Sequence, residues 1–361
     1  MRYSPKHMDV AVVGGGPAGG AIAMLLARAG VATIVLARSN RREQRIGETL
    51  PPVANLLLQD FGIWSSFRKQ QHLPAEGVVS VWSDARPQIN DFFRSPQGTG
   101  WNLDRTRFDT MLLQEGENAG AVVCRDATVV SCSKSHKRGW ELEFCHAGST
   151  VNVFSRHLVD ATGRTGTAAL AFLARRIVTD RLIGVARFFK CDDRSRYTLV
   201  EAVEEGWFYS AGLPNGQLVA VYFTDADIHA CGRKKGPDYW ERQLGKAVHT
   251  RNRLGDISVL CGERIVSAAT SRRARIAGSG WISVGDAALS FDPLSSLGIY
   301  KALDSTIRAN HSIQQALRGH SGDTNYANWS DEIYGHYLKQ HREIYRAQGR
   351  WPESTFWKRR R

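Results

Sequence analysis

Residues 8–19 read MDVAVVGGGPAG, and this stretch decides the fold of the 361-residue chain. The apolar run Met8–Val13 predicts a short strand, and the apolar spacing of Pro17–Ala29 predicts a helix that ends at Gly30. The glycines between them fit GxGxxG, a spacing that lets the backbone approach a diphosphate at the partly positive start of a helix. Because the motif lies between a strand and a helix, it predicts a nucleotide-binding βαβ unit. The expected contacts come from Gly14, Gly16, Pro17, Ala18 and Gly19.

The second predicted strand, Thr33–Leu36, departs from the usual motif at its end. An acidic residue about 20 positions beyond the glycines normally binds the ribose hydroxyls of the nucleotide. Here Ala37 stands in that place and Arg38 follows it. Backbone and water can hold the ribose, or Arg38 can contact it, and an arginine at this point is also compatible with NADP.

Patterns in the rest of the chain predict an α/β fold with interleaved domains. Helical spacing recurs at Arg105–Asn118, Ser296–Leu317 and Tyr326–Gln348, whereas the segment from Asp180 to about Ile265 has mostly strand patterns. No proline-, glycine- or serine-rich linker divides the chain. We expect a discontinuous Rossmann-type nucleotide-binding domain, a mostly antiparallel β substrate-binding domain and C-terminal helices. The predicted bounds are 1–72, 101–165 and 270–320 for the first, 73–100 and 166–269 for the second, and 321–361 for the helical tail.

The composition is that of an ordinary globular protein, with 42% hydrophobic residues and a formal net charge of +13. The charge is dispersed and accompanies no nucleic-acid-binding module, so we expect a solvated surface and no nucleic-acid partner; docking of an acidic protein is the alternative. The six cysteines are scattered and no cluster has metal-ligand spacing, so we expect no metal site. No segment has the apolar length of a membrane span or a signal peptide, which predicts a cytoplasmic protein without membrane contact.

Two later segments decide between the possible nucleotides. Trp281–Ala288 reads WISVGDAA, and Pro293–Ile299 reads PLSSLGI. Together with the glycine motif, Val159–Arg164 and Leu103–Asp109, they resemble the FAD-dependent monooxygenases that share a fold with para-hydroxybenzoate hydroxylase. The resemblance spans almost the whole chain and implies FAD in a glutathione-reductase-like Rossmann domain. Besides the glycine motif, it implies cofactor contacts from Ala37, Arg38, Arg45, Arg105, Val129, Thr162, Gly163, Gly285, Asp286, Pro293, Gly298 and Ile299.

Further motifs concern the catalytic end of this predicted site. Arg45–Pro52 resembles a loop beside the isoalloxazine ring in flavin-dependent halogenases and related hydroxylases, where burial would make Glu48 a proton-transfer group. Gly206–Gly212 stands where halogenases carry W-x-W-x-I-P, but Tyr209 replaces the second tryptophan. Residues 73–101 hold no lysine, the residue that carries hypohalous acid in halogenases, so halogenation is disfavoured. The predicted catalytic residues are Glu48, Ser295 and Ser296 near the flavin edge, and Trp207 and Tyr209 in the substrate pocket.

Gly100–Arg105, Asp292–Ser296, Gly206–Tyr209 and the tail Tyr345–Arg360 resemble in particular the flavoproteins that mature cysteine tryptophylquinone enzymes, the lysine and glycine oxidases. This resemblance implies oxygen insertion into a tryptophan side chain of a precursor protein or peptide, a quinoprotein oxidase or dehydrogenase subunit. It also implies O2 as co-substrate, with NADH, NADPH or a flavin reductase partner as electron donor. The alternatives are a small-molecule aromatic hydroxylase or epoxidase, a flavin-dependent alkene reductase, and a non-catalytic flavin-dependent subunit that docks a quinoprotein.

Overall fold

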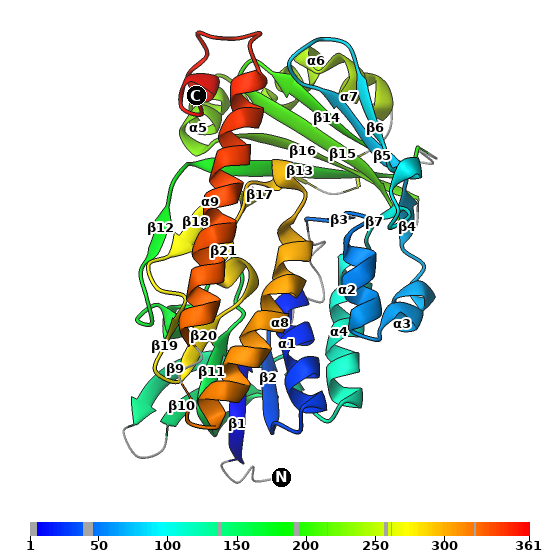
Figure 1. The fold of residues 1–361 in the computed structure, drawn as a ribbon. Helices are drawn as coiled ribbons and strands as arrows, with labels where there is room; N and C mark the ends of the chain where they lie inside the picture. Colours follow the sequence, from blue (N-terminus) through cyan, green and yellow to red (C-terminus); the bar gives the residue numbers. More distant parts are fainter. Residues whose placement is uncertain are drawn as a thin grey trace.

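The computed structural model describes residues 6–38, 46–135, 139–190, 195–214, 216–255, 259–260, 262–320 and 323–361. The predicted cofactor residue Arg45 lies outside these residues. Figure 1 shows a Rossmann-type half that contains the N-terminus and, above it, a second half built on another sheet. No helix of the described chain combines the length and the apolar character that a membrane span requires.

The Rossmann-type half is built on a sheet with a parallel centre. Its described path is β19-β20-β11-β1-β2-β8, in which β1 pairs in parallel with both β2 and β11. Val10 and Val12 pack on one face against helix α1, whereas Ala11 and Val13 pack on the other face with residues of β10. Helices α1, α4 and α8 lie side by side in Figure 1. The bounds are β1 (Lys6–Val13), α1 (Pro17–Arg28), β2 (Thr33–Ala37), α4 (Arg105–Asn118), β8 (Val122–Arg125), β9 (Thr128–Ser135), β10 (Gly139–His146), β11 (Ser149–Asp160), β19 (Ala277–Gly278), β20 (Trp281–Ser283) and α8 (Gly298–Leu317).

The second half is a sheet of seven described strands in the order β17-β13-β16-β15-β14-β5-β6. All its pairs are antiparallel except β14 with β5. Alternation along β15 separates the two faces: Phe208 packs toward helices α6 and α7, and Trp207 and Tyr209 point to the opposite face. The bounds are β5 (Gly77–Val81), β6 (Gln88–Asp91), β13 (Leu182–Lys190), β14 (Tyr197–Val203), β15 (Gly206–Leu213), β16 (Gln217–Asp225), α6 (Tyr239–Lys246), α7 (Val248–Leu254) and β17 (Arg264–Ser267).

The prediction of mostly strands from Asp180 to Ile265 is incomplete, because residues 226–254 form helices. These are α5 (Ala226–Lys234), α6 and α7. They are short and rich in charged residues, and their buried side chains, such as Tyr239 and Trp240, pack against apolar residues of the sheet. Such helices depend on tertiary packing more than on a long periodic pattern, so the sequence signal is weak.

A long C-terminal helix, α9 (Asp323–Ala347), runs along both halves in Figure 1 and leads to the short helix α10 (Thr355–Lys358). The α/β class, the parallel Rossmann-type sheet, the antiparallel sheet and the C-terminal helices are as predicted. The remaining strands and α-helices are small. They are β3 (Thr49–Leu50), α2 (Ala54–Asp60), α3 (Trp64–Lys69), β4 (Leu73–Ala75), β7 (Gly100–Asn102), β12 (Arg176–Val178), β18 (Ser271–Arg273) and β21 (Leu289–Ser290).

Candidate active site

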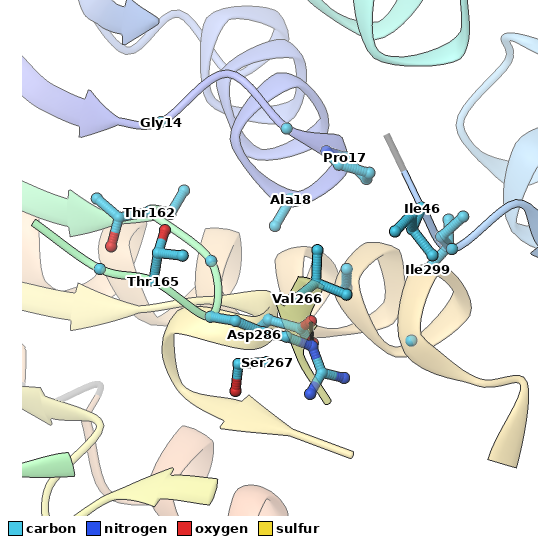
Figure 2. A pocket seen from close by; sticks show the side chains of 18 of the residues that line it. Gly14, Pro17, Ala18, Ile46, Thr162, Thr165, Val266, Ser267, Asp286 and Ile299 are labelled. Carbon is cyan, nitrogen blue, oxygen red and sulfur yellow. Dashed lines mark ion pairs between the residues drawn. The ribbon is translucent and has the colours of Figure 1, made fainter. Parts of the chain in front are cut away.

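A cavity of about 930 Å³ extends from the carboxyl end of β1 to the inner face of the second sheet. Figure 2 shows Pro17 and Ala18 at the start of α1 facing Asp286 across this cavity, with Ile299 of α8 at one end. Ligands in open α/β sheets bind outside the carboxyl ends of the strands, which is where this cavity lies. The predicted site residues that line it are Gly14, Gly16, Pro17, Ala18, Arg38, Glu48, Arg105, Val129, Thr162, Gly163, Tyr209, Asp286, Pro293, Ser296, Gly298 and Ile299.

The glycine turn at the start of α1 has the geometry of a diphosphate cradle. Gly14 has φ +117°, and a Cβ there would lie 2.2 Å from the carbonyl oxygen of Ala161. A Cβ on Gly19 would lie 1.9 Å from the carbonyl oxygen of Gly14, so both positions require glycine. Gly16 differs, because a Cβ there would meet no protein atom within 4 Å and the residue lines the cavity. Since no side chain caps α1, its first backbone N–H groups are available to a phosphate.

The ribose end of the cavity involves Arg38 rather than Ala37. The side chain of Ala37 packs so closely over Gly15 that a Cβ on that glycine would lie 2.5 Å from it. Ala37 therefore does not line the cavity, whereas Arg38 and Val129 do. Of the two residues that the sequence placed here, only the arginine lines the cavity.

Asp286 lies in the middle of the cavity wall between two cations that sequence analysis did not assign. Its carboxylate is 3.0 Å from Arg164 Nε and 2.7 Å from Lys301 Nζ. Burial favours the neutral acid, but Lys301 and Arg164 outweigh it and hold the pKa of Asp286 below its ordinary value. Asp286 is therefore an ionised acceptor for hydroxyl groups such as those of a ribityl chain. The signal for Lys301 is a lysine within the apolar stripe of α8, where only 2% of its surface is exposed.

A buried network of arginines supports this wall. Arg176 donates hydrogen bonds to the carbonyl oxygens of Gly163 and Asp286, at 3.1 and 3.2 Å. Arg273 forms an ion pair with Asp160, which is fully buried at the end of β11. The wall thus contains more cationic than acidic side chains among these residues, an electrostatic setting that favours a negatively charged ligand.

Glu48 lies at the far end of the cavity with its carboxyl group buried. Oε2 accepts a hydrogen bond from the backbone N–H of Gly47 at 2.9 Å, and Oε1 has no partner among the described residues. Burial raises the pKa of Glu48 to about 7, against the opposing effects of the Gly47 hydrogen bond and Arg105. Arg105 also holds the loop by donating to the carbonyl oxygens of Ile46 and Gly47 at 3.1 and 2.9 Å. A carboxyl group with a free oxygen and this pKa can accept or donate a proton at neutral pH.

Tyr209 approaches the same end of the cavity from the second sheet. Its hydroxyl lies 2.6 Å from Thr49 Oγ1, next to Glu48 in the chain. Burial and the neighbouring Glu48 carboxyl raise the pKa of Tyr209 above its ordinary value, so the phenol stays protonated. Phe223 of β16 also lines this end, which gives an apolar and aromatic wall opposite the loop.

Besides Ala37, four of the predicted residues lie behind the cavity wall. Gly19 and Gly285 allow close packing, since a Cβ on Gly285 would lie 2.9 Å from the Ala18 side chain. Ser295 turns its hydroxyl to the carbonyl oxygen of Asp292 at 2.9 Å, whereas its neighbour Ser296 lines the cavity. Trp207 is buried in the core, where it stacks on Phe223 at 4.1 Å and does not line the pocket. The placement of Ser295 and Trp207 at the cavity is thus corrected, because each side chain is taken up by contacts within the protein.

These features fit FAD. The open Gly16 position and the start of α1 suit a diphosphate, the ionised Asp286 suits a polyhydroxyl chain, and the unpaired oxygen of Glu48 lies at the apolar end where a flat ring has room. The volume is also in the range of cofactor pockets.

Comparisons with known proteins agree with this geometry. The profile of the family described as FAD binding domain matches residues 7–333. The chain is 31% identical to the putative FAD-dependent oxidoreductase LodB of Marinomonas mediterranea, over 98% of this chain and 97% of that protein. It is 24% identical to a flavin-dependent halogenase of Armillaria mellea, over 92% of this chain and 69% of the halogenase.

Solved structures share the fold. The myxobacterial chondrochloren halogenase CndH superimposes with a TM-score of 0.90 at 21% identity, over 99% of this chain and 86% of CndH. The peptidyl tryptophan dihydroxylase QhpG, essential for tryptophylquinone cofactor biogenesis, superimposes with a TM-score of 0.75 at 23% identity, over 98% of this chain and 78% of QhpG. With the glycine cradle, the Asp286 wall and the family profile in agreement, the chain belongs to the FAD binding domain family of flavin-dependent oxidoreductases.

Proposed function

We propose that this flavin-dependent enzyme is a monooxygenase that hydroxylates an aromatic ring, and that the ring is a tryptophan side chain of a precursor protein or peptide. The similarity to LodB over nearly the full length of both chains supports a FAD-dependent oxidoreductase. The proposal is also supported by the fold shared with QhpG, which is itself a peptidyl tryptophan dihydroxylase. The precursor would be a quinoprotein oxidase or dehydrogenase subunit.

The observation that carries the proposal is the buried carboxyl group of Glu48 with its unpaired oxygen at the apolar end of the cavity. Hydroxylation of an aromatic ring requires protons to be moved at the reacting atoms while bulk water is kept out. Glu48 can hold a proton there because burial brings its pKa to about 7. Tyr209 and Phe223 would bound the space that the aromatic substrate occupies, and Tyr209 would remain a hydrogen-bond donor.

The remaining residues hold the cofactor. The Gly14–Gly19 turn and the start of α1 would bind the diphosphate, Arg38 the adenosine end, and Asp286 the ribityl hydroxyls. FAD, when bound and reduced, supplies the activation of O2. NADH, NADPH or a partner flavin reductase would supply the electrons.

Halogenation is the second candidate, because flavin-dependent halogenases are prominent among the relatives and the solved structures. The residues that line the cavity favour oxygenation over halogenation. Among the described lining residues the cationic side chains are all arginines (Arg38, Arg105, Arg164 and Arg264). The fold resemblance implies a lysine as the carrier of hypohalous acid in halogenases, and Lys301 is bound to Asp286 behind the wall.

The experiment offers every candidate chemistry at once. FAD-loaded protein receives NADH with and without a flavin reductase, O2, bromide, a tryptophan-containing quinoprotein precursor, free tryptophan, phenol and a polyene. Mass spectrometry then reads each substrate. The proposal expects oxygen added to a tryptophan of the precursor. Bromine on any ring supports halogenation, and oxygen only on a free aromatic supports a small-molecule hydroxylase. Turnover without O2 consumption supports an alkene reductase, and flavin oxidation that leaves every substrate unchanged supports a docking subunit.

A matched pair of variants isolates Glu48. The Glu48→Gln variant keeps the shape but cannot ionise, so we expect product formation to fall about 100-fold while FAD still binds. Glu76→Gln changes an exposed carboxylate paired with Arg196 and should leave the rate unchanged. A wild-type rate in the Glu48→Gln variant would remove Glu48 from the mechanism.

A further inference from the structure

The turn between β21 and α8 forms one edge of the cavity, and its shape depends on Asp292. The carboxylate Oδ1 accepts a hydrogen bond from the backbone N–H of Leu294 at 2.9 Å, and the carbonyl oxygen accepts from Ser295 N–H and Oγ at 3.1 and 2.9 Å. Ser296 then takes the left-handed conformation, with φ +52°. The turn leads to Gly298, where α8 begins without a side-chain cap. The orientation of Asp292 therefore sets how the first N–H groups of a 20-residue helix meet the cavity.

Asp292 is held from behind by one face of the C-terminal helix α9. Tyr345 donates a hydrogen bond from its hydroxyl to Oδ2 of Asp292 at 2.8 Å, and Nε2 of His341 lies 3.2 Å from the same oxygen. The backbone N–H of Asp292 donates to the hydroxyl of Tyr337 at 2.9 Å. Positions 337, 341 and 345 are four residues apart, so the three side chains share one stripe of the helix. The family profile ends at residue 333, so this stripe lies beyond it.

The same tyrosine is tied to the second sheet. Trp207 of β15 donates from Nε1 to the hydroxyl of Tyr345 at 3.1 Å, and Trp207 stacks on the cavity-lining residue Phe223. Trp82 packs edge-on against Tyr345 and donates from Nε1 to the carbonyl oxygen of Ile344 at 2.8 Å. Burial and the Asp292 carboxylate raise the pKa of Tyr345 well above its ordinary value, so its hydroxyl remains a donor. Tyr345 thus accepts from one half of the molecule and donates to the other.

We propose that Tyr345 is a positioning residue of the flavin site: its hydroxyl, oriented by Trp207, fixes Asp292 and with it the turn that aims the start of α8 at the cofactor. The inference rests on FAD occupying the cavity and does not depend on which substrate is oxidised. It also assigns to Trp207 a role in holding the site from behind its wall.

The test uses the full chain and two tyrosine variants on the same helix. Tyr345→Phe removes the donor and keeps the ring. Tyr334→Phe is the control, because the buried hydroxyl of Tyr334 makes no hydrogen bond to the Asp292 turn. For Tyr345→Phe we expect faster amide hydrogen exchange at Leu294–Ile299 in the FAD-free protein, an FAD dissociation constant raised about tenfold, and an altered visible circular dichroism of bound FAD. Trp207→Phe should shift the same three readouts in the same direction by a smaller amount.

The role of Tyr345 is overturned if both tyrosine variants match the wild type in exchange and flavin dichroism. It is equally overturned if Tyr345→Phe lowers only the unfolding temperature while FAD affinity and dichroism stay unchanged, because that result describes a purely structural side chain. None of these readouts involves turnover, so failure of the tryptophan hydroxylation test leaves them intact. Failure to bind FAD at all would instead contradict the functional proposal.

Discussion

The residue Glu48 has a buried carboxyl oxygen without a hydrogen-bond partner among the described residues, which is unusual in a protein interior. A buried carboxyl oxygen without a partner is costly once the group ionises, and a stable fold normally avoids it. Arg105 contacts the loop carbonyls instead of neutralising the carboxylate directly. The group is therefore left poised between its two protonation states near neutral pH.

This arrangement predicts a pH-dependent cost in stability. Below the ordinary pKa of 4.5 both folded and unfolded chains keep the Glu48 proton, so the residue contributes no difference. Above pH 4.5 the unfolded chain releases the proton, and the folded chain retains it until about pH 7, so the native state loses up to about 3 kcal/mol as pH rises through this window. Glu48→Gln stays neutral and should become progressively more stable than the wild type. Thermal unfolding of the FAD-free proteins on both sides of the window measures this. An equal difference at low and high pH would show that Glu48 is not desolvated.

Some residues of the candidate site could be predicted from the sequence and others could not. Gly14 and Gly16 were predictable because local spacing alone fixes a strand, a tight turn and a helix start, whereas Asp286 was identified only through the family resemblance of residues 281–288. Lys301 carried only a weak signal, its place within the apolar stripe of α8, because a lysine in a helix turns inward only when a partner such as Asp286 is present. Trp207 and Tyr209 share a face of β15, and the pattern could not tell that one is covered by Tyr345, a residue 138 positions away.

In the strand-turn-helix element at the N-terminus, one glycine is required by the fold and another faces the cavity where the ligand would bind. Gly14 needs its positive φ and its contact with Ala161, whereas Gly16 has an ordinary backbone with φ −83° and free space beside it. The boundaries of β1, α1 and α4 followed from periodicity for the same local reason. Helices α5 to α7 escaped prediction because the sheet, and not their own sequence, supplies their apolar partner.

We therefore expect alanine substitutions at Gly16 and Gly14 to have different effects, one on FAD binding and the other on stability. Gly16→Ala should unfold at the wild-type temperature without FAD yet bind FAD at least about tenfold more weakly, because the methyl group occupies the path of the diphosphate. Gly14→Ala should lower the unfolding temperature itself, through backbone strain and overlap with Ala161. Calorimetry with an FAD titration distinguishes the two. Unchanged FAD affinity in Gly16→Ala would place the diphosphate elsewhere.

Helix α8 makes a second prediction through Lys301. Replacing it by methionine leaves Asp286 with Arg164 as its one remaining ion-pair partner among the described contacts, and removes the hydrogen bond to the Leu289 carbonyl oxygen. We expect a loss of about 2–3 kcal/mol in unfolding free energy at neutral pH, since a buried pair is broken. Denaturant unfolding at neutral and acidic pH is the measurement. The loss should shrink in acid, where Asp286 becomes protonated, and a loss independent of pH would point to packing alone.

At the scale of the whole molecule, the C-terminal segment joins the two halves. Helix α9 contacts the Asp292 turn between β21 and α8. The residues after α9 pack over the second sheet, where Arg359 and Arg360 both bind the buried carboxylate of Asp225. The sequence of this tail showed a family resemblance. It did not predict the contacts of the tail, because these join residues more than a hundred positions apart.

Substitution of Asp225 tests whether the C-terminal tail stabilises the fold by binding the second sheet. Asp225→Asn leaves Arg360, which is only 7% exposed, without its ionic partner, so we expect a loss of about 3 kcal/mol. Asp238→Asn breaks an exposed pair with Arg242 and should leave the stability unchanged. Chemical denaturation of both variants gives the comparison. Similar stability of the two would mean that the tail is not a structural tie.

The binding of FAD in this cavity is tested most directly by an experimental structure of the FAD-loaded chain. We expect the diphosphate on the backbone of Gly14–Gly19, the ribityl chain at Asp286 and the isoalloxazine ring beside Glu48, next to the start of α8. A ring directed away from Glu48, or a nicotinamide dinucleotide in place of FAD, would contradict it.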